Sequence, residues 1–284
     1  MSHNQGLDQA EGLRRMLGPG TIRIISFISA VPPAQKNEIL QNLAAALVQT
    51  GSEVHLLDAS QLQDGISSCA ASPSQVFLSD VTQQNVAQAL ATKEQNQGIY
   101  ITKLSREPIS QMADQPKALE NLSIALRELS PKTGFCLVDT HLDNDNPFVL
   151  SELAQGDVVV LTANTIDSIK SAYAQIKALH TQLGRRSYQI LVIGASPHQA
   201  AKIQQNMSQA ANRYLAVPLT SLGSIPSDEH MSRAAQLRRS VIEAFPTAGA
   251  SVAFREIATR LVDNHINVTS PFSRSDSHFA KMEV

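Results

Sequence analysis

Three ionisable residues stand at a predicted helix start or at the ends of predicted strands. Lys36 begins a helical pattern directly after a buried strand-like run, and Asp58 and Asp139 each end another apolar run. A lysine at a helix start could contact a phosphate, but a lone one there is more often a solvated charge, and this is the simpler interpretation of Lys36. A carboxylate at a strand end can accept N–H bonds from a neighbouring helix start, which would give both aspartates a structural role.

Other patterns of catalytic or metal-binding residues are absent from the sequence. The histidines lack the spacing of metal ligands; they include His55, His141, His180, His198 and His230. There is no Gly-x-Ser-x-Gly turn that would present a nucleophile. Cys69 and Cys136 match no metal or redox spacing, and Cys136 lies in an apolar run typical of a buried strand. We therefore expect no metal site.

The composition indicates an ordinary globular protein. The chain has 284 residues, of which 43 % are apolar and 17 % are charged, and its formal net charge is −2. Such a chain can bury a sizeable core. It has no net basic field to hold a polyanion, so we expect no nucleic-acid binding. The polar N-terminus and the lack of an apolar run of roughly 20 residues predict a cytoplasmic protein.

Apolar strand-like stretches alternate with helical ones along the chain. The strands are expected at 22–29, 53–58, 98–104, 134–139, 157–161, 188–193 and 219–225. The helices are expected at 8–17, 36–49, 81–91, 118–129, 165–180, 227–237 and 249–263, with one more around Ile203–Leu215. This order predicts a doubly wound, mostly parallel sheet with helices on both faces. The expected organisation is an N-terminal partner-binding helix at 1–20, an α/β domain at 21–265 and a polar, flexible tail at 266–284.

Several stretches together resemble one family. The order of elements resembles the MinD/ParA branch of P-loop NTPases, and local stretches resemble its FlhG/FleN flagellar-number regulators. They are Asp8–Arg14 (DQAEGLR), Thr165–Leu179, Val217–Asp228 (VPLTSLGSIPSD) and Ala253–Ala258 (AFREIA). The resemblance spans about residues 7–263 and implies the MinD-like fold and an ATP-dependent switch.

The phosphate-binding loop is where the sequence departs from this family. The family's loop reads Gly-Lys-Gly-Gly-x-Gly-Lys-Thr, and the matching stretch here is Ala30–Asn37 (AVPPAQKN), aligned through Asn42–Ala44. No glycine is left, and two positions are proline, which has no N–H to donate. Asn37 replaces the Mg²⁺-binding hydroxyl, so only Lys36 of the binding pattern remains.

The other positions implied by the resemblance agree with this loss. The family's Asp-x-Asp after the second strand is Asp58–Ser60 here, so the water-activating carboxylate is missing. Asp139 matches the Mg²⁺-assisting aspartate, but His141 and Leu142 replace the small turn that follows. Phosphoryl transfer depends on positioning and charge neutralisation, so we expect no ATP hydrolysis and no cofactor. Lys36, Asp58 and Asp139 would be vestigial cofactor-binding residues.

The N-terminal segment is the candidate for partner binding. In the resembling family it stimulates an SRP-type GTPase, FlhF, which implies that Asp8, Gln9, Leu13 and Arg14 are contact residues. The alternative is a helix packed on its own domain. A flagellar transcriptional activator or switch protein could bind the α/β body. The tail mixes two phenylalanines with serines and an aspartate, so we expect no stable membrane attachment.

The sequence thus predicts a degenerate MinD/FlhG-like regulator of flagellar number or placement that acts by protein binding and is a pseudo-ATPase. One alternative keeps an ATP-dependent switch ATPase, in which Lys36, Asp58 and Asp139 serve an atypical ATP and Mg²⁺ site and ATP clamps a homodimer. A second alternative is a partition-type relative that binds DNA, against which the net charge of −2 argues.

Overall fold

The computed structural model describes residues 22–60, 63–70, 76–84, 92–96, 98–129, 134–142 and 147–269. Its elements are β1 (Arg23–Ser29), α2 (Pro33–Gln49), β2 (Glu53–Asp58), η1 (Ile66–Cys69), α3 (Leu78–Gln84), β3 (Thr92–Asn96), β4 (Ile99–Lys103), η2 (Ile109–Met112), α5 (Pro116–Arg127), β5 (Gly134–Asp139), η3 (Pro147–Val149), α6 (Ser151–Gln155), β6 (Asp157–Ala163), α7 (Ile166–Leu183), β7 (Tyr188–Ile193), α8 (Pro197–Leu215), β8 (Leu219–Ile225), α9 (Glu229–Gln236), α10 (Val241–Ala244) and α11 (Gly249–Thr269).

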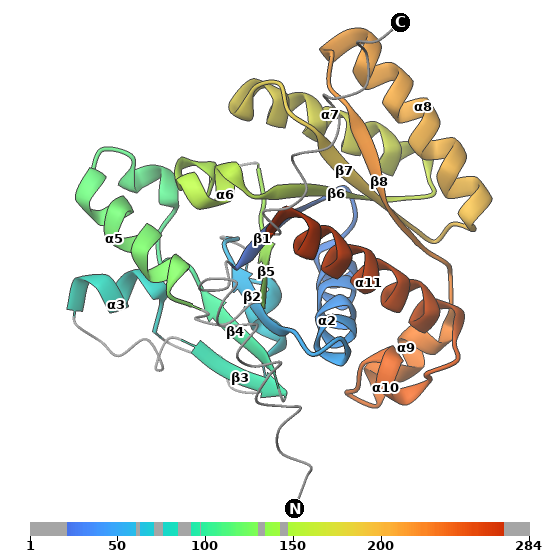
Figure 1. Cartoon of the computed structure of the whole chain (residues 1–284), viewed down its shortest axis with the longest axis horizontal. Coiled ribbons are helices and arrows are strands. Elements are labelled where there is room, and N and C mark those ends of the chain that lie inside the picture. Colours follow the sequence, from blue (N-terminus) through green and yellow to red (C-terminus); the bar gives the residue numbers. More distant parts are fainter. Residues whose placement is uncertain are drawn as a thin grey trace, which may run out of the picture.

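The strands form one eight-stranded sheet in the order β3-β4-β2-β5-β1-β6-β7-β8 (Figure 1). β3 pairs with β4 in the antiparallel direction, and the other strands are all parallel. The predicted doubly wound, mostly parallel fold is confirmed. The chain proceeds from β1 toward β2 on one side and, after β5, toward β6 on the other. Ligand sites of such sheets lie at this reversal, at the carboxyl ends of the strands.

Helices cover both faces of the sheet and create two apolar cores (Figure 1). Alternate residues of β1 divide between them: Ile25 and Phe27 pack with α2 and α11, whereas Ile24 and Ile28 pack with the helices on the opposite face. Every residue of β5 is buried. Strands covered on both sides need apolar residues at consecutive positions, which explains why they were recognisable as continuous apolar runs.

The predicted boundaries fit several strands of the sheet and fail around β3. The predictions for β2, β5, β7 and β8 match the structure at both ends. The antiparallel strand β3 was not predicted, because Thr92–Asn96 is polar and gives no alternating apolar pattern. The helix expected at 81–91 begins earlier, at Leu78, and its described part ends at Gln84. α11 continues to Thr269, beyond the predicted end at residue 263.

The predicted partner-binding helix at 1–20, with Asp8, Gln9, Leu13 and Arg14, lies outside the described residues. The same holds for residues 270–284 of the predicted tail. Within the part of the chain that is described, no helix is long and apolar enough to cross a bilayer.

Candidate functional site

The turn after β1 is folded tightly onto itself. The Ser29 hydroxyl donates to the carbonyl of Val31 at 2.9 Å and accepts the N–H of Val31 at 3.0 Å. The N–H of Ala30 continues the sheet by donating to the carbonyl of Leu161 in β6 at 2.9 Å. Both N–H groups at the start of the turn therefore already have partners inside the protein.

The second half of the turn is shaped by two prolines. Pro32 precedes α2 and Pro33 is the first residue of this helix, where a fixed φ fits the helical conformation and a missing N–H costs nothing. The N–H groups of Gln35 and Lys36 both donate to the carbonyl of Pro32, at 3.0 and 3.1 Å. The prolines thus begin the helix well, but they remove two of the donors from which a phosphate cradle would be made.

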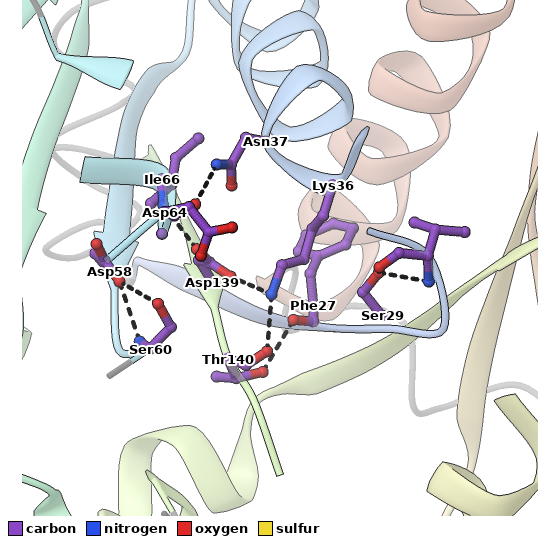
Figure 2. Close-up of polar contacts among 12 residues, drawn as sticks. Phe27, Ser29, Lys36, Asn37, Asp58, Ser60, Asp64, Ile66, Asp139 and Thr140 are labelled. Atoms are coloured by element: carbon purple, nitrogen blue, oxygen red, sulfur yellow. Dashed lines mark hydrogen bonds and ion pairs between the residues drawn. The ribbon is translucent and has the colours of Figure 1, made fainter. Parts of the chain in front are cut away.

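The Lys36 side chain points inward from the first turn of α2 and is only 2 % exposed. Its ammonium forms an ion pair with Asp139 Oδ1 and donates to the carbonyl of Thr140 at 3.0 Å (Figure 2). Thr140 is itself fixed, because its hydroxyl donates to the carbonyl of Phe27 at 2.9 Å. The interpretation of Lys36 as a solvated charge was therefore wrong, since the helix start directs the side chain toward the end of β5.

Asp139, the last residue of β5, is fully buried. Its Oδ2 atom accepts the N–H of Ile66, from η1, at 2.8 Å. Burial raises the pKa of Asp139 above its ordinary value, the Lys36 ammonium acts to lower it, and the negative charge of Asp58 raises it again. A buried carboxylate in this position needs a nearby cation to remain ionised, and Lys36 is placed to supply that charge.

Asp58 lies beside Asp139, because these two residues pair in register on β2 and β5. Its Oδ1 atom accepts both the N–H of Ser60 at 3.1 Å and the Ser60 hydroxyl at 2.9 Å. Its Oδ2 atom accepts the N–H of Ser67 at 3.1 Å and, by a short hydrogen bond, the Ser67 hydroxyl. Both aspartates thus accept N–H bonds from η1, in the structural role expected for a carboxylate at a strand end.

Gly65 allows the chain to pass directly over Asp58. A Cβ atom on Gly65 would lie 2.4 Å from the Ser60 hydroxyl oxygen and 2.7 Å from each carboxylate oxygen of Asp58. Its φ of −62° is open to any residue, so the requirement here is for space and not for an unusual backbone angle. The site therefore depends on a glycine after β2, at a position that belongs to no recognisable sequence motif.

Asn37 ties the same segment to α2. Its side-chain amide donates to the carbonyl of Asp64 at 2.8 Å, and Asn37 is only 4 % exposed (Figure 2). This position matches the Mg²⁺-binding hydroxyl of the resembling family. Here the side chain instead bridges two parts of the protein.

As arranged, the residues do not fit a Mg²⁺-nucleotide held by its phosphates. A phosphate loop needs several free N–H groups around one anion, together with a lysine that reaches it. The turn at residues 30–36 contains two prolines and has partners for four N–H groups, those of Ala30, Val31, Gln35 and Lys36. The Lys36 ammonium is already held by Asp139 and Thr140.

The structure thus brings Lys36, Asp58 and Asp139 together at the carboxyl ends of the central strands (Figure 2). Sequence reasoning missed the residues that close over them, namely Asp64, Gly65, Ile66 and Ser67. A single glycine in a Ser- and Gln-rich stretch was the only available signal. Among the described residues, no group of histidine, cysteine or acidic side chains is suited to hold a metal ion.

Comparison with known proteins shows what the whole chain is similar to. No family model matches the chain. The antiactivator FleN of Pseudomonas aeruginosa is 26 % identical over 250 residues, which cover 88 % of this chain and 89 % of FleN. The chain has the MinD/ParA-like fold and resembles proteins of the FlhG/FleN type. The MinD/ParA-like fold is also seen in the MinC:MinD cell division complex of Aquifex aeolicus, with a TM-score of 0.61 and 18 % identity over 85 % of this chain and 96 % of the other.

A ParA family ATPase from Chlorobium tepidum has the same MinD/ParA-like fold. Its TM-score is 0.60, its identity is 17 %, and the match covers 85 % of this chain and 99 % of the other. The match to FleN spans most of both chains, so the likeness is not confined to a short motif.

Proposed function

We propose that this MinD/ParA-like protein regulates flagellar number or placement by binding other proteins, without binding or hydrolysing ATP. The observation that supports this proposal is the ion pair between Lys36 and Asp139. In it, a lysine and a carboxylate that would serve phosphate and Mg²⁺ in the family neutralise each other. The likeness to an antiactivator over 88 % of the chain supports a regulatory role.

The energetics favour a pseudo-ATPase. ATP would have to displace the Lys36 ammonium from Asp139 and Thr140, and would leave a buried carboxylate without its cation. Leaving a buried charge unpaired costs about 3–5 kcal/mol. The turn at 30–36 offers few N–H groups to repay this cost, because Pro32 and Pro33 have none. Phosphoryl transfer also needs a positioned water, and Ser60 stands where the family has the carboxylate that activates it.

The partner that we propose is an SRP-type GTPase of the FlhF class, contacted through residues 1–20. The motif at Asp8, Gln9, Leu13 and Arg14 supports this part of the proposal, because it matches the segment through which the family stimulates that GTPase. A body that needs no nucleotide to keep its shape would serve as a constant scaffold for this segment. A flagellar transcriptional activator or switch protein is the proposed second partner.

The test is a GTPase assay with an FlhF-type partner. The full-length protein should accelerate GTP hydrolysis, and a peptide of residues 1–20 should retain part of this effect. The double variant Leu13→Ala/Arg14→Ala should lose it. Lys177→Ala, which changes an exposed residue of α7, is the matched control and should keep it. An unchanged rate with both the protein and the peptide would refute the assignment of the N-terminal segment.

An ATP-dependent switch remains the second candidate, because Lys36, Asp58 and Asp139 do converge at the end of the sheet where this fold binds ligands. In that case Lys36 would leave Asp139 when nucleotide enters, and ATP would promote a homodimer. Lys36→Ala would then weaken nucleotide binding and assembly together. Light scattering with and without ATP, on the protein and on this variant, separates the two candidates.

A further inference from the structure

Residues 63–70, which follow β2 in the sequence and contain η1, are held by contacts from three different elements. The N–H of Ile66 donates to Asp139 of β5, the N–H of Ser67 donates to Asp58 of β2, and the carbonyl of Asp64 accepts from Asn37 of α2. In Figure 2 the bonds from Asn37 and Asp139 to this segment lie on one side of the Lys36 side chain. We call residues 63–70 the closing segment.

The contacts of the closing segment lie in the interior. Ile66 is completely buried and Ser67 is 5 % exposed, while Asp58 and Asp139 are 3 % and 0 % exposed. Hydrogen bonds from N–H groups to ionised carboxylates are stronger than those to neutral acceptors, and low polarity strengthens them further. The same environment penalises the charge itself, so the bonds persist only while the carboxylate charge is compensated.

Lys36 is the cation that the structure places beside Asp139. It reaches this position from α2, so a single ion pair joins α2, β5 and, through the N–H of Ile66, the closing segment. The Lys36 ammonium also lies at the strand ends where Asp58 and Asp139, which pair in register, bring two negative charges together. Removing it would leave both carboxylates and both N–H bonds without this compensation.

We propose that the Lys36–Asp139 ion pair is an internal tether that fixes the closing segment against the sheet, so that its conformation is set by the chain itself and not by a bound ligand. Lys36 and Asp139 then act as positioning residues. This inference rests on the proposed function, in which the protein works without nucleotide. It adds that the closing segment has a single conformation, closed against the sheet.

Hydrogen–deuterium exchange of the full-length protein tests this tether. In the absence of ligand, amides of the closing segment should be protected, and millimolar ATP with Mg²⁺ should leave their exchange unchanged. In Lys36→Met they should exchange at least roughly tenfold faster, because an uncompensated Asp139 becomes protonated and accepts more weakly. Amides of β7, far from the pair along the sheet, should not change. Lys177→Met on the exposed face of α7 is the matched control.

A second variant covers the case in which Lys36→Met fails to fold. Lys36→Met/Asp139→Leu replaces the pair by apolar side chains, which often preserves or improves stability. It also removes the acceptor of the Ile66 N–H. A folded double variant should therefore show fast exchange confined to the closing segment. Protection equal to that of the unmodified protein, in either variant, would overturn the tether.

The results with nucleotide separate the two proposals. ATP binding that leaves the closing segment unchanged would contradict the proposed function and leave the tether intact. A closing segment that is unprotected alone and becomes protected only with ATP and Mg²⁺ would overturn the tether.

Discussion

Two successive backbone N–H groups bind the two central carboxylates of this protein: Ile66 donates to Asp139 and Ser67 donates to Asp58. This relationship is possible because Asp58 and Asp139 pair in register on neighbouring parallel strands, which lie about 4.8 Å apart. A segment that follows β2 thereby caps the ends of both strands. In a doubly wound sheet the carboxyl ends of the strands border the region where ligands bind.

The first prediction concerns how much the Lys36–Asp139 ion pair contributes to the stability of the protein. Lys36→Met should lower the free energy of unfolding by about 3–5 kcal/mol, because it leaves a buried carboxylate without its partner. Lys36→Met/Asp139→Leu should recover most of this loss, since no buried charge remains. Urea unfolding of the two variants beside Lys177→Met measures both effects. A single variant as stable as the control would show that the pair is not needed for folding.

The passage of the closing segment over Asp58 gives the second prediction. Gly65→Ala should destabilise the protein by about 1–3 kcal/mol, because the new methyl group overlaps with the Asp58 carboxylate and the Ser60 hydroxyl. Gly249→Ala is the control, since a Cβ there meets its nearest atoms at an ordinary 3.6 Å. Thermal unfolding compares the two. If both variants melt together, the segment is not held as closely as the structure describes.

Cys69 offers a chemical report on the closing segment. It is the last residue of η1 and is partly buried, and burial is the main cause that raises the pKa of its thiol. Its reaction with a thiol reagent should be slow in the unmodified protein and several-fold faster in Lys36→Met. Cys136 is buried with a pKa raised to about 12, so it should stay unreactive in both. Cys69→Ser assigns the signal; an equal rate with and without Lys36 would argue against the tether.

His55 should make stability depend on pH. It is 4 % exposed and stacks on Tyr100 with ring centroids 5.0 Å apart. Burial lowers the pKa of His55 to about 4, against an opposing effect of Glu53. The unfolded chain therefore binds a proton at His55 more readily than the folded protein does. The contribution of neutral His55 to the free energy of unfolding is complete above the unfolded pKa, near 6.5, and is lost as the pH falls through 4.

The loss in the free energy of unfolding that His55 causes should be on the order of 3 kcal/mol, because each unit of pKa shift corresponds to about 1.4 kcal/mol. Unfolding by urea at pH 7.5 and pH 4.5 measures most of it, because pH 4.5 lies near the lower end of the interval between the two pKa values. His55→Phe should flatten the dependence. His198→Gln, on the exposed start of α8, should not. The same pH slope in His55→Phe would assign the effect to another group.

The sequence predicted the central sheet well, because β2, β5 and β7 are apolar runs bounded by clear breaks. The resemblance to the MinD/ParA-like family singled out Lys36, Asp58 and Asp139 as vestigial cofactor-binding residues, and that role stays a prediction. The sequence could not predict how they interact. The direction of the Lys36 side chain depends on α2 beginning at Pro33, three residues before the predicted start.

The closing segment was not predictable for a different reason. This segment is held by contacts with other elements, made by Asp64, Gly65 and Ser67. The local periodicity of apolar residues does not predict such contacts. The polar strand β3 was missed because its pairing with β4 is a tertiary interaction. In both cases the conformation depends on contacts with residues that are not sequence neighbours, so local secondary-structure propensity cannot predict it.

The most direct test of nucleotide independence is a fluorescent-ATP titration of the purified full-length protein with Mg²⁺, with Lys36→Ala as the control. We predict no saturable binding up to millimolar nucleotide, and the same trace for both proteins. Micromolar binding that Lys36→Ala abolishes would contradict the account, because it would mean that the ammonium leaves Asp139 for a phosphate and that ATP controls this protein.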